Sequence, residues 1–377
     1  MMNGCDFLII GGGIAGASLG FRLSEHGKVT ILEAEDQPGY HSSGRSATHF
    51  NISLGKRAAR VLTHLSRSFF LDPPPGFAEH PLWSARATLT VANAERIPQL
   101  RRQHDELRDL LPETEWLSGT EILRVLPIAR IAPEGIEAAV LDRTSFHLDG
   151  HGLLQGYLSF VRRRGGQLVT QAPCEEIAFR DGRWQVQAKG KTFSAPILVN
   201  ASGAWADKVA VLAGVKPIGL QPLRRTVVTI SAPAGANWSQ FPFVRSIGDD
   251  FYFAPEGQGL LISPADETPM PPSDVQPDDL DVAVAIDRFE QATTQQVERP
   301  RRSWSGLRSF VADRVPVVGF DPQAPGFFWL AGQGGVGLQT SPALSATAAA
   351  LLLHGGVPDE VSSAGLSAQD LGPQRLW

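Results

Sequence analysis

The stretch FLIIGGGIAGAS, residues 7–18, constrains the fold of this chain more than any other feature. It begins as a short β-branched and aromatic run, which predicts a buried strand. This strand runs directly into the pattern G-x-G-x-x-G, formed by Gly11, Gly13 and Gly16. Apolar residues then recur at helical spacing up to Gly27, and KVTILE predicts a second strand. The order of these elements predicts a Rossmann-type dinucleotide-binding unit.

Each part of this unit has a role in binding a dinucleotide. The first glycine permits a tight turn, the second lets the backbone approach a pyrophosphate, and the third lets helix and strand pack closely. The helix N-terminus favours the negative charge. Glu33 ends the second strand, about 20 residues after the motif, where a carboxylate accepts hydrogen bonds from an adenosine ribose. This acid does not distinguish NAD from FAD.

Two later segments bear on that choice. Residues 37–50, QPGYHSSGRSATHF, offer small hydroxyls, backbone donors and Arg45 to a phosphate. Near the C-terminus, GFFWLAGQGGVGLQTS predicts a strand, a glycine loop and a helix. The loop repeats the glycine pattern at Gly332, Gly334 and Gly337. A second nicotinamide site would need an acid closing a following strand, whereas Asp359 and Glu360 lie in a turn rich in Pro and Gly. We therefore expect this helix N-terminus to face the pyrimidine carbonyl of a flavin.

The 377 residues are enough for about two domains. We predict an α/β fold, in which a Rossmann-like FAD-binding domain is joined to an α+β substrate domain with a mostly antiparallel sheet and helices. The short strands RRTVVTISAP, FYFAPE and GLLISPADE, separated by Pro and Gly turns, predict that antiparallel sheet. The FAD-binding domain is expected to be discontinuous, with residues 1–85, 141–219 and 301–377. The substrate-binding domain is expected to comprise residues 86–140 and 220–300.

Composition argues against several other classes of protein. The net charge of −5 and the lack of a basic tail argue against nucleic acid as a partner. The longest apolar run, ATAAALLL, is far shorter than the roughly 18–20 residues of a membrane span, and MMNGCD has no basic leader region. The two cysteines, Cys5 and Cys174, form neither a disulfide framework nor a metal-ligand set. We expect a cytoplasmic monomer or homodimer with no metal and no membrane span.

Several segments together resemble the D-amino acid oxidase-like (DAO) family of FAD-dependent oxidoreductases, and within it the D-arginine dehydrogenase-type D-amino acid dehydrogenases. They run in order along nearly the whole chain: IIGGGIAGAS with Glu33, QPGYHSSGRSATHF, LVNASGAWAD, LQPLRR, FYFAPE, SGLRSFVADRVPVVG and FFWLAGQGGVGLQTS. The resemblance implies a two-domain fold, bound FAD and hydride transfer from the Cα of an amino acid to flavin N5. The FAD should be non-covalent, because residues 300–340 contain no cysteine to link it there.

The resemblance also implies which residues hold the substrate. Arg225 and Arg308 match the arginines that clamp its carboxylate, although Arg224 is a competing assignment for the first of them. A guanidinium suits this role because its planar fork binds a carboxylate through two parallel hydrogen bonds. Tyr252 matches a tyrosine whose hydroxyl lies at the same group. His49 matches a position near the amino group, where it could be a base or a hydrogen-bond partner.

Two positions near the substrate's side chain depart from the family pattern. Thr88 stands where an acid would grip a cationic side chain, and Leu54 where a tyrosine would cover the substrate. Loss of that carboxylate leaves a desolvated guanidinium unpaired. We therefore expect oxidative deamination of a D-amino acid with a neutral or hydrophobic side chain rather than arginine. The products would be the imino acid and then a 2-oxo acid and ammonia, with electrons passing to an unidentified acceptor.

The resemblance assigns the remaining contacts to the cofactor and leaves other functions open. Gly335, beside the flavin, would also contact the substrate. The cofactor-binding positions are Gly11, Gly13, Ile14, Ala15, Gly16, Glu33, Ala34, Ser42, Ser43, Gly44, Arg45, Ser46, Ala47, Thr48, His49, Cys174, Ser202, Gly203, Trp205, Gly334, Gly335, Val336, Gly337, Leu338 and Gln339. The alternatives are an oxidase that uses O₂ to oxidise glycine, sarcosine or a D-amino acid, a non-catalytic flavin-binding subunit and a nicotinamide dehydrogenase.

Overall fold

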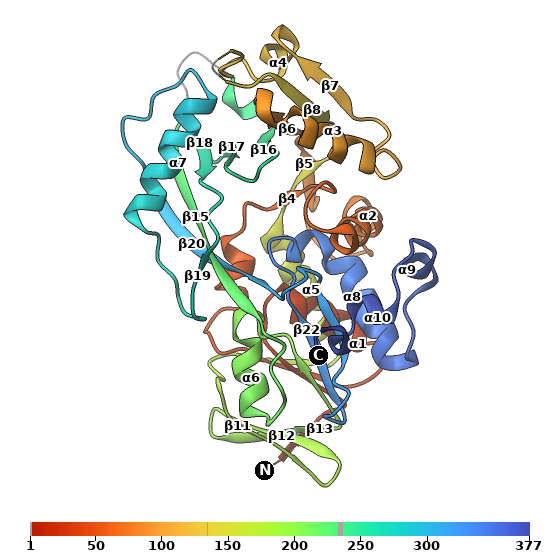
Figure 1. Cartoon of the computed structure of the whole chain (residues 1–377). Helices are drawn as coiled ribbons and strands as arrows, with labels where there is room; N and C mark the ends of the chain where they lie inside the picture. The colour runs from red at the N-terminus through yellow and green to blue at the C-terminus, as the bar shows by residue number, and fades with distance from the viewer. Residues whose placement is uncertain (1, 134, 233–236) are drawn as a thin grey trace.

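The computed structural model describes residues 2–133, 135–232 and 237–377. Two large sheets organise this part of the chain (Figure 1). One sheet lies among the helices α1, α5, α6 and α8, and the other lies beside α7. The six-stranded sheet carries the glycine motif and the nine-stranded sheet carries Arg225 and Arg308.

The six-stranded sheet begins with the strands that the sequence predicts around the motif. Its order is β10 (Gln167–Val169), β3 (Val29–Leu32), β2 (Phe7–Ile10), β14 (Ile197–Asn200), β22 (Phe327–Ala331) and β21 (Val317–Phe320). All neighbouring strands are parallel except β21, which runs antiparallel to β22. Strands from the beginning, middle and end of the chain therefore pair in one sheet, which confirms the mixed α/β fold class.

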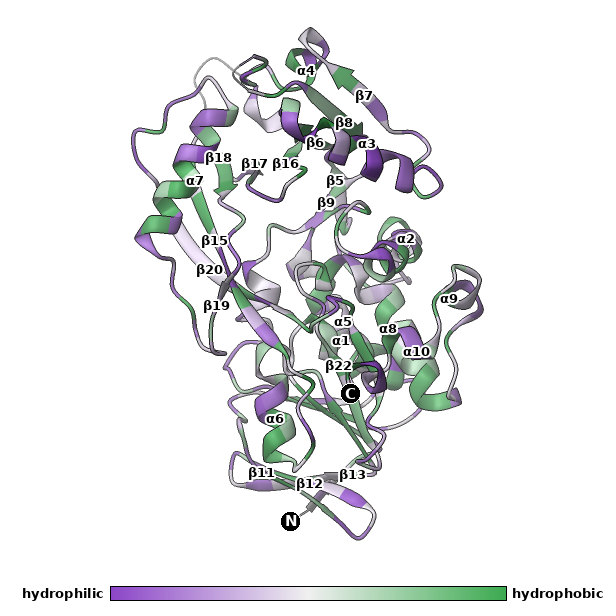
Figure 2. Cartoon of the chain, viewed as in Figure 1, coloured by the Kyte–Doolittle hydropathy of each residue, from purple (hydrophilic) through white to green (hydrophobic). Residues whose placement is uncertain are grey.

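The strands of this sheet are hydrophobic on both faces because both faces are covered. On β2, Phe7 and Ile9 pack with the helices α1 (Ile14–Leu23), α5 (Gly150–Arg163) and α8 (Gly337–His354). Leu8 and Ile10 pack on the other side, with α6 (Ala206–Leu212) and a four-stranded sheet. Continuous apolar strands are typical of such doubly covered parallel sheets, and Figure 2 shows them together with the apolar α8.

Two smaller sheets adjoin the six-stranded one. The four-stranded sheet has the order β1 (Met2–Gly4), β13 (Lys191–Ala195), β12 (Arg183–Ala188) and β11 (Cys174–Arg180). It contains the tryptophan-bearing hairpin that the sequence predicts, with Trp184 buried. The three-stranded sheet has the order β4 (His49–Phe50), β9 (Phe146–Leu148) and β5 (Trp83–Ala85).

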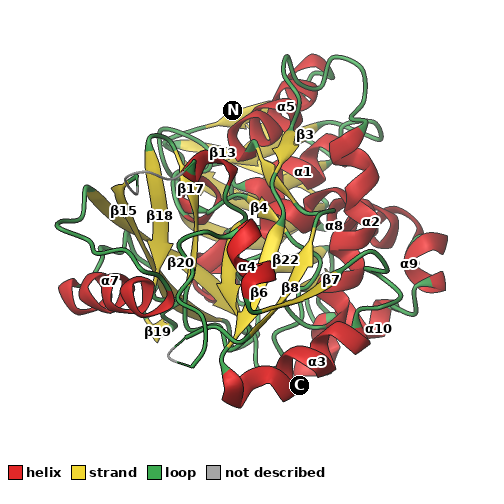
Figure 3. Cartoon of the chain, turned by 90° about the horizontal axis from the view of Figure 1, so that it is seen from above, coloured by secondary structure: helices red, strands yellow, loops and turns green. Residues whose placement is uncertain are grey.

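The nine-stranded sheet is antiparallel apart from one pair. Its order is β19 (Thr268–Pro269), β15 (Gln221–Ser231), β18 (Gly259–Ser263), β17 (Tyr252–Glu256), β16 (Phe243–Ser246), β6 (Thr88–Ala92), β8 (Ala138–Asp142) and β7 (Glu115–Ser118), with β20 (Arg302–Phe310) on β15. The parallel pair is β16 with β6. Helix α7 (Asp279–Ala292) covers this sheet on the side away from α1 and α8 (Figure 3).

The position of β20 bears on the expected domain boundary at residue 301. The sequence predicts that residues 301–377 belong to the FAD-binding domain, and in the structure β20 pairs with β15 over nine residue pairs, from Gln221↔Phe310 to Thr229↔Arg302. The strand after residue 301 therefore belongs to the nine-stranded sheet, and the chain returns to the six-stranded sheet at β21. Sequence patterns do not reveal this, because strand pairing depends on tertiary contacts.

The remaining helices lie at the edges of this framework. They are α2 (Arg57–Leu71), α3 (Ile97–Glu106), α4 (Thr120–Val125), α9 (Asp359–Ser363) and α10 (Ala368–Leu371), with short 3₁₀ turns η1 (Ser42–Arg45), η2 (Ala94–Arg96), η3 (Gly203–Trp205), η4 (Trp238–Gln240) and η5 (Pro373–Leu376). Asp359 and Glu360 open α9 rather than lying in a turn. In the described part of the chain no helix is long and apolar enough to cross a membrane.

Candidate active site

The glycine motif forms the tight junction between β2 and α1. A β-carbon on Gly16 would lie 2.0 Å from the carbonyl oxygen of Gly11, so only glycine lets the helix pack this closely on the strand. The backbone N–H of Ile14, in the first helical turn, donates to Ser43 Oγ at 3.0 Å. The loop of residues 37–50 therefore lies over the helix N-terminus, where N–H groups and the helix dipole favour an anion.

Glu33 follows β3 directly, and the backbone holds its carboxylate in place. Oε2 accepts from the N–H of Gly12 at 2.7 Å, and Oε1 accepts from the N–H of Glu35 at 2.9 Å. The side chain is buried, and each oxygen retains accepting capacity. Glu33 is thus fixed at the carboxyl end of its strand, where a ribose would lie.

Cys174 lies near Glu33 at the same end of the six-stranded sheet. The N–H of Ala172 donates to the carbonyl oxygen of Glu33 at 2.9 Å, which brings the segment before β11 against this edge. Burial raises the pKa of the Cys174 thiol to about 12, so the thiol stays protonated at neutral pH. We therefore expect Cys174 to contribute backbone contacts near the adenine rather than thiol chemistry.

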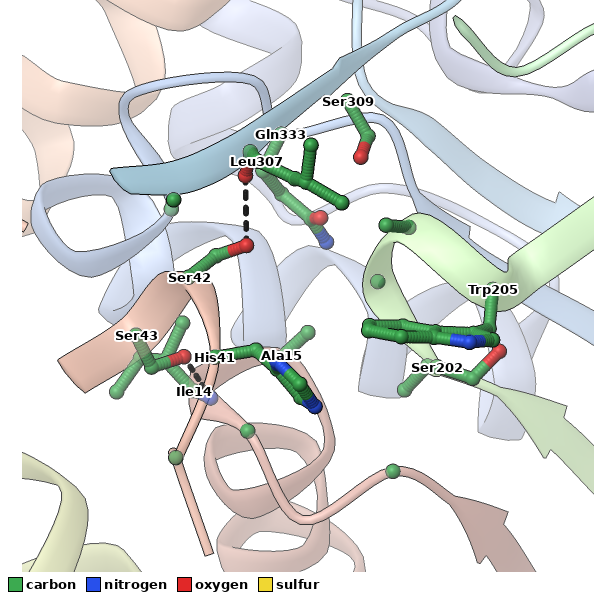
Figure 4. A pocket seen from close by; sticks show the side chains of 18 of the residues that line it. Ile14, Ala15, His41, Ser42, Ser43, Ser202, Trp205, Leu307, Ser309 and Gln333 are labelled. Carbon is green, nitrogen blue, oxygen red and sulfur yellow. Dashed lines mark hydrogen bonds between the residues drawn. The ribbon is translucent and has the colours of Figure 1, made fainter. Parts of the chain in front are cut away.

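A cavity of about 450 Å³ connects the glycine motif with the nine-stranded sheet. This volume is within the range of ligand pockets. Figure 4 shows several of its lining side chains around one space, contributed by widely separated parts of the chain. They include His41, Ser42, Ser43, Ser202, Trp205, Leu307, Ser309 and Gln333. The cavity therefore lies between the two large sheets.

Alternation along the strands directs the functional side chains of the nine-stranded sheet to this cavity. Successive strand residues point to opposite faces. Val228 and Phe253 belong to the apolar core on the α7 side. Their sequence neighbours on the other face include Tyr252, which lines the cavity, as do Arg225 and Arg308. One sheet face thus brings together three residues that lie up to 83 positions apart in sequence.

Arg308 is a guanidinium without a counter-ion in the described residues. It makes no hydrogen bond within residues 2–133, 135–232 and 237–377, and its Cζ lies 6.0 Å from the Tyr252 ring centre. Burial lowers the pKa of Arg308 to about 10, and the neighbouring charge of Arg225 adds to this. An arginine remains charged at that pKa, so a positive charge with free donors faces the cavity, as a carboxylate site requires.

The Arg225 guanidinium donates hydrogen bonds to one carbonyl group and one carboxylate of the protein. Its Nε donates to the carbonyl oxygen of Asp266 at 2.8 Å, and its Nη2 donates to Glu267 Oε1 at 3.3 Å. Its Cζ lies 5.9 Å from the Tyr252 ring centre. Arg224 points the other way and pairs with Asp281 at 2.7 Å, outside the cavity. The geometry therefore favours Arg225 over Arg224.

Gly335 packs directly against Arg308. A β-carbon at residue 335 would lie 2.7 Å from Arg308 Cζ and 2.8 Å from both Nε and Nη1. Any side chain at this position would displace the guanidinium. The glycine loop before α8 therefore leaves the space in which the Arg308 guanidinium lies.

His49 does not line the cavity, although the sequence places it at the substrate. Its Nε2 hydrogen bonds to Thr88 Oγ1 at 2.7 Å, and its ring stacks on Phe243 with centres 4.3 Å apart. Phe243 in turn stacks on Tyr252 at 5.5 Å, so an aromatic ring separates His49 from the tyrosine. Burial, and then the charges of His147 and Arg86, lower the pKa of His49 well below its usual value. This arrangement argues against a direct role for His49 as a catalytic base.

The two positions expected near the substrate's side chain also lie outside the cavity lining. Thr88 is buried and bonds to His49, and Leu54 lies in the turn before α2. Their departure from the family pattern therefore gives no direct reading of the substrate's side chain. Alternation along the strand could have indicated which face of the sheet Thr88 lies on, but not that it would hydrogen bond to His49.

Two of the expected cofactor residues have side chains that bond to other parts of the protein. The Arg45 guanidinium, expected to meet a phosphate, pairs with Asp274 at 2.6 Å and donates to the carbonyl oxygen of Ser305 at 3.0 Å. Gln339 is buried, and its amide bonds to the backbone of Asn51 and to Thr63 Oγ1. Both side chains are occupied in holding segments of the fold together, which spacing in the sequence does not reveal.

Most of the expected positions line the cavity. Those that do are Gly11, Gly13, Ile14, Ala15, Glu33, Ala34, Ser42, Ser43, Arg45, Ser46, Ala47, Cys174, Ser202, Gly203, Trp205, Gly334, Gly335, Gly337 and Leu338, with Arg225, Tyr252 and Arg308. Those that do not are Gly16, Gly44, Thr48, His49, Leu54, Thr88, Val336 and Gln339. Their roles toward cofactor and substrate remain proposals.

Gln333 is a cavity residue that sequence reasoning missed. Its Nε2 is buried and has no hydrogen-bond partner in the part of the chain that the structure describes. It lines the cavity with Ser309 (Figure 4). A buried amide donor without a partner is costly, so it indicates a polar ligand atom nearby. The sequence signal that could have indicated Gln333 is its position inside the second glycine pattern, between Gly332 and Gly334.

These residues fit FAD. The anion-favouring helix N-terminus, the fixed Glu33 carboxylate and the unpartnered Gln333 amide occur along one cavity. They match a pyrophosphate, a ribose and a polar ring edge in turn. Within the described ranges no group of three His, Cys, Asp or Glu side chains is placed to hold a metal ion.

Comparison with known proteins points the same way. A family model described as "FAD dependent oxidoreductase" (DAO) matches residues 6–351. Mitochondrial dimethylglycine dehydrogenase of Rattus norvegicus is 26% identical over 269 residues, which cover 69% of this chain and only 30% of that protein. Glycine oxidase of Bacillus licheniformis is 23% identical over 376 residues, covering 94% of this chain and 95% of that enzyme. The crystal structure of L-proline dehydrogenase from P. horikoshii has the same fold, with a TM-score of 0.85 at 18% identity over 100% of this chain and 98% of that one.

Proposed function

The chain belongs to the DAO family of FAD-dependent oxidoreductases, and we propose that it oxidises the C–N bond of a D-amino acid whose side chain is not cationic. The observation that carries the proposal is the unpaired Arg308 guanidinium beside Arg225 and Tyr252 in the cavity. A free amino acid carries the carboxylate that this site lacks. The D configuration rests on the sequence resemblance alone.

The role of the protein residues is to bind and orient the substrate. Arg308 and Arg225 bind the carboxylate through charge-assisted hydrogen bonds, and the Tyr252 hydroxyl donates a third. This fixes the direction of the Cα–H bond, so that much of the barrier is lowered by positioning. Bound FAD supplies the two-electron acceptor for the hydride. The imino acid then leaves and hydrolyses to a 2-oxo acid and ammonia.

The charges of the cavity support the exclusion of cationic side chains. The acidic residues that line it are Glu33 and Glu35, which lie at the ribose end. At the opposite end the lining charges are those of Arg225 and Arg308. A second cation on the substrate would find no lining carboxylate there, and its desolvation would be uncompensated.

Anaerobic reduction of the bound flavin tests this function. A panel of D- and L-amino acids, glycine and sarcosine is mixed with the holoprotein, and bleaching of the flavin absorbance is followed. We expect several D-amino acids to reduce the flavin and D-Arg and D-Lys to do so least. A panel led by D-Arg or D-Lys would contradict the proposal, and no bleaching by any member would favour a flavin-binding subunit without turnover.

An O₂-using oxidase of glycine, sarcosine or a D-amino acid is the second candidate. The similarity to glycine oxidase over 94% of the chain favours it. Stopped-flow reoxidation of the reduced flavin in air separates the candidates. Rapid reoxidation identifies an oxidase, whereas slow reoxidation with rapid transfer to an artificial acceptor identifies a dehydrogenase.

A further inference from the structure

A third arginine lies beside the proposed carboxylate site. Arg245 on β16 is the cross-strand partner of Tyr252 on β17, so the two side chains share one face of the sheet. Tyr252 lines the cavity, and Arg245 lies next to it, outside the lining itself. Arg245 is buried, with 5% of its surface exposed. Arginine is almost never buried to this extent unless it is paired.

The pairing of Arg245 is incomplete. Its Nη1 donates to Ser53 Oγ at 3.3 Å, and its Nη2 donates to Asp249 Oδ1 at 2.5 Å. A guanidinium has five N–H donors. The Ser53 hydroxyl is neutral, and the Asp249 side chain is 70% exposed, so the counter-charge of this buried cation is largely in water. Such an exposed partner contributes little.

Asp249 also interacts electrostatically with Arg308. Burial and then Arg225 lower the pKa of Arg308, whereas Asp249 acts in the opposite direction. The Asp249 carboxylate is therefore close enough to interact with Arg308 while it is bonded to Arg245. It lies in the turn between β16 and β17, with a left-handed backbone at φ 54°. Asp249 is thus an exposed carboxylate that bonds to Arg245 and also interacts electrostatically with Arg308.

We propose that Arg245 determines specificity by binding a second anionic group of the substrate, so that the preferred substrate is a dicarboxylic amino acid. This inference rests on the proposed function, since it takes Arg308 and Arg225 to hold the α-carboxylate. The distal carboxylate replaces Asp249 on Arg245, and Asp249 turns toward solvent. The substrate thereby supplies the buried counter-charge that Arg245 lacks.

Dead-end ligands test this without depending on turnover or chirality. Succinate and glutarate are titrated into the FAD holoprotein against their monoamides, succinamate and glutaramate, and the flavin absorbance change gives each Kd. We expect the better dicarboxylate to bind about tenfold more tightly than its monoamide, as a charge-assisted hydrogen bond would provide. General damage to the protein changes both Kd values alike, so their ratio reports only the distal carboxylate.

Two variants change the ratio in opposite directions. Arg245→Met should bring it to about one, because the cation is gone. Asp249→Asn should raise it, because the internal competitor loses its charge, and asparagine tolerates the left-handed backbone. The exposed Arg108 lies in the turn after α3 and pairs with Asp105 of that helix. It gives a matched control, and Arg108→Met should leave the ratio unchanged.

Three outcomes overturn the proposal. The first is a wild-type ratio of monoamide Kd to dicarboxylate Kd near one, and the second is a ratio that does not rise in Asp249→Asn. The third is tighter binding of cationic ligands that is lost in Asp249→Asn, which would show that Asp249 selects cations. If the monoamides bind but the dicarboxylates bind no better, only this inference fails. If no carboxylate perturbs the flavin, the proposed function itself fails.

Discussion

Replacing Gly335 with alanine tests the carboxylate site through geometry alone. The added β-carbon would lie 2.7 Å from Arg308 Cζ and 2.8 Å from Nε and Nη1. Ordinary contacts between such atoms are about 3.5–4.0 Å, so the guanidinium must move by about 1 Å. Because the obstructed atoms are the tip of a flexible side chain, they can move without disturbing the core.

The expected loss is therefore in binding and not in stability. A charge-assisted hydrogen bond contributes about 1.5–3 kcal/mol, so its loss should raise the Kd of a carboxylate ligand by roughly 10- to 150-fold. The free energy of unfolding should change by less than about 1 kcal/mol, since glycine-to-alanine changes also restrict the unfolded chain. The Kd is measured by titrating butyrate into the holoprotein, and unfolding by chemical denaturation.

Gly337, two residues further along and the first residue of α8, provides the control. A β-carbon there would meet Gln333 Cβ and Ile14 Cγ2 at 3.5 Å, which is ordinary contact. Gly337→Ala should leave butyrate binding within about twofold of the wild type. Equal effects of the two substitutions, or unchanged binding in Gly335→Ala, would refute the assignment of Arg308 to the carboxylate.

Three further outcomes follow from the site and the fold. Arg308→Met should raise the KM of the best amino acid substrate by roughly 10- to 150-fold. FAD should remain bound, as the retained yellow absorbance would report. An unchanged KM would show that Arg308 does not bind the substrate. Gly16→Ala should weaken FAD binding and destabilise the protein by at least about 1–3 kcal/mol, because its β-carbon would lie 2.0 Å from the Gly11 carbonyl oxygen. Chemical denaturation measures the stability, and FAD fluorescence measures the binding. A variant as stable as the wild type would contradict the close packing. Burial lowers the pKa of His49 well below 6.5, so the unfolded chain binds a proton there that the folded chain does not. The free energy of unfolding should fall by up to about 1.4 kcal/mol per unit as pH drops below about 6.5, and an equal slope in His49→Asn would contradict this.

The cofactor end of the site could be predicted from sequence because its determinants are local. Gly11, Gly13 and Gly16 act within one strand–helix junction, and Glu33 ends the adjacent strand. Spacing along the chain therefore specifies the geometry directly. The predicted resemblance to the DAO family and the predicted FAD cofactor are confirmed by the match over residues 6–351. The preference for D-amino acids stays a prediction.

The partners of individual side chains could not be predicted, because they depend on contacts distant in sequence. The Arg45 guanidinium bonds to Asp274, more than 200 residues away in sequence. Thr88 bonds to His49 because β4 and β6 lie close together in the fold. Nothing in either local sequence specifies these neighbours. The resemblance assigns roles to positions, but it does not specify the contacts that each side chain makes.

The charge pattern of the nine-stranded sheet gives the strongest argument for an anionic substrate. Arg225, Arg245 and Arg308 share one face, and buried cations are stable only with counter-charges. Glu267 supplies one counter-charge, but it bonds to Arg314 as well as to Arg225. Asp249 supplies another, but its side chain is mostly in water. Arg308 has none among the described residues, so the face carries more positive charge than its own carboxylates neutralise. A ligand with one carboxylate satisfies Arg308, whereas a ligand with two also supplies the buried partner that Arg245 lacks.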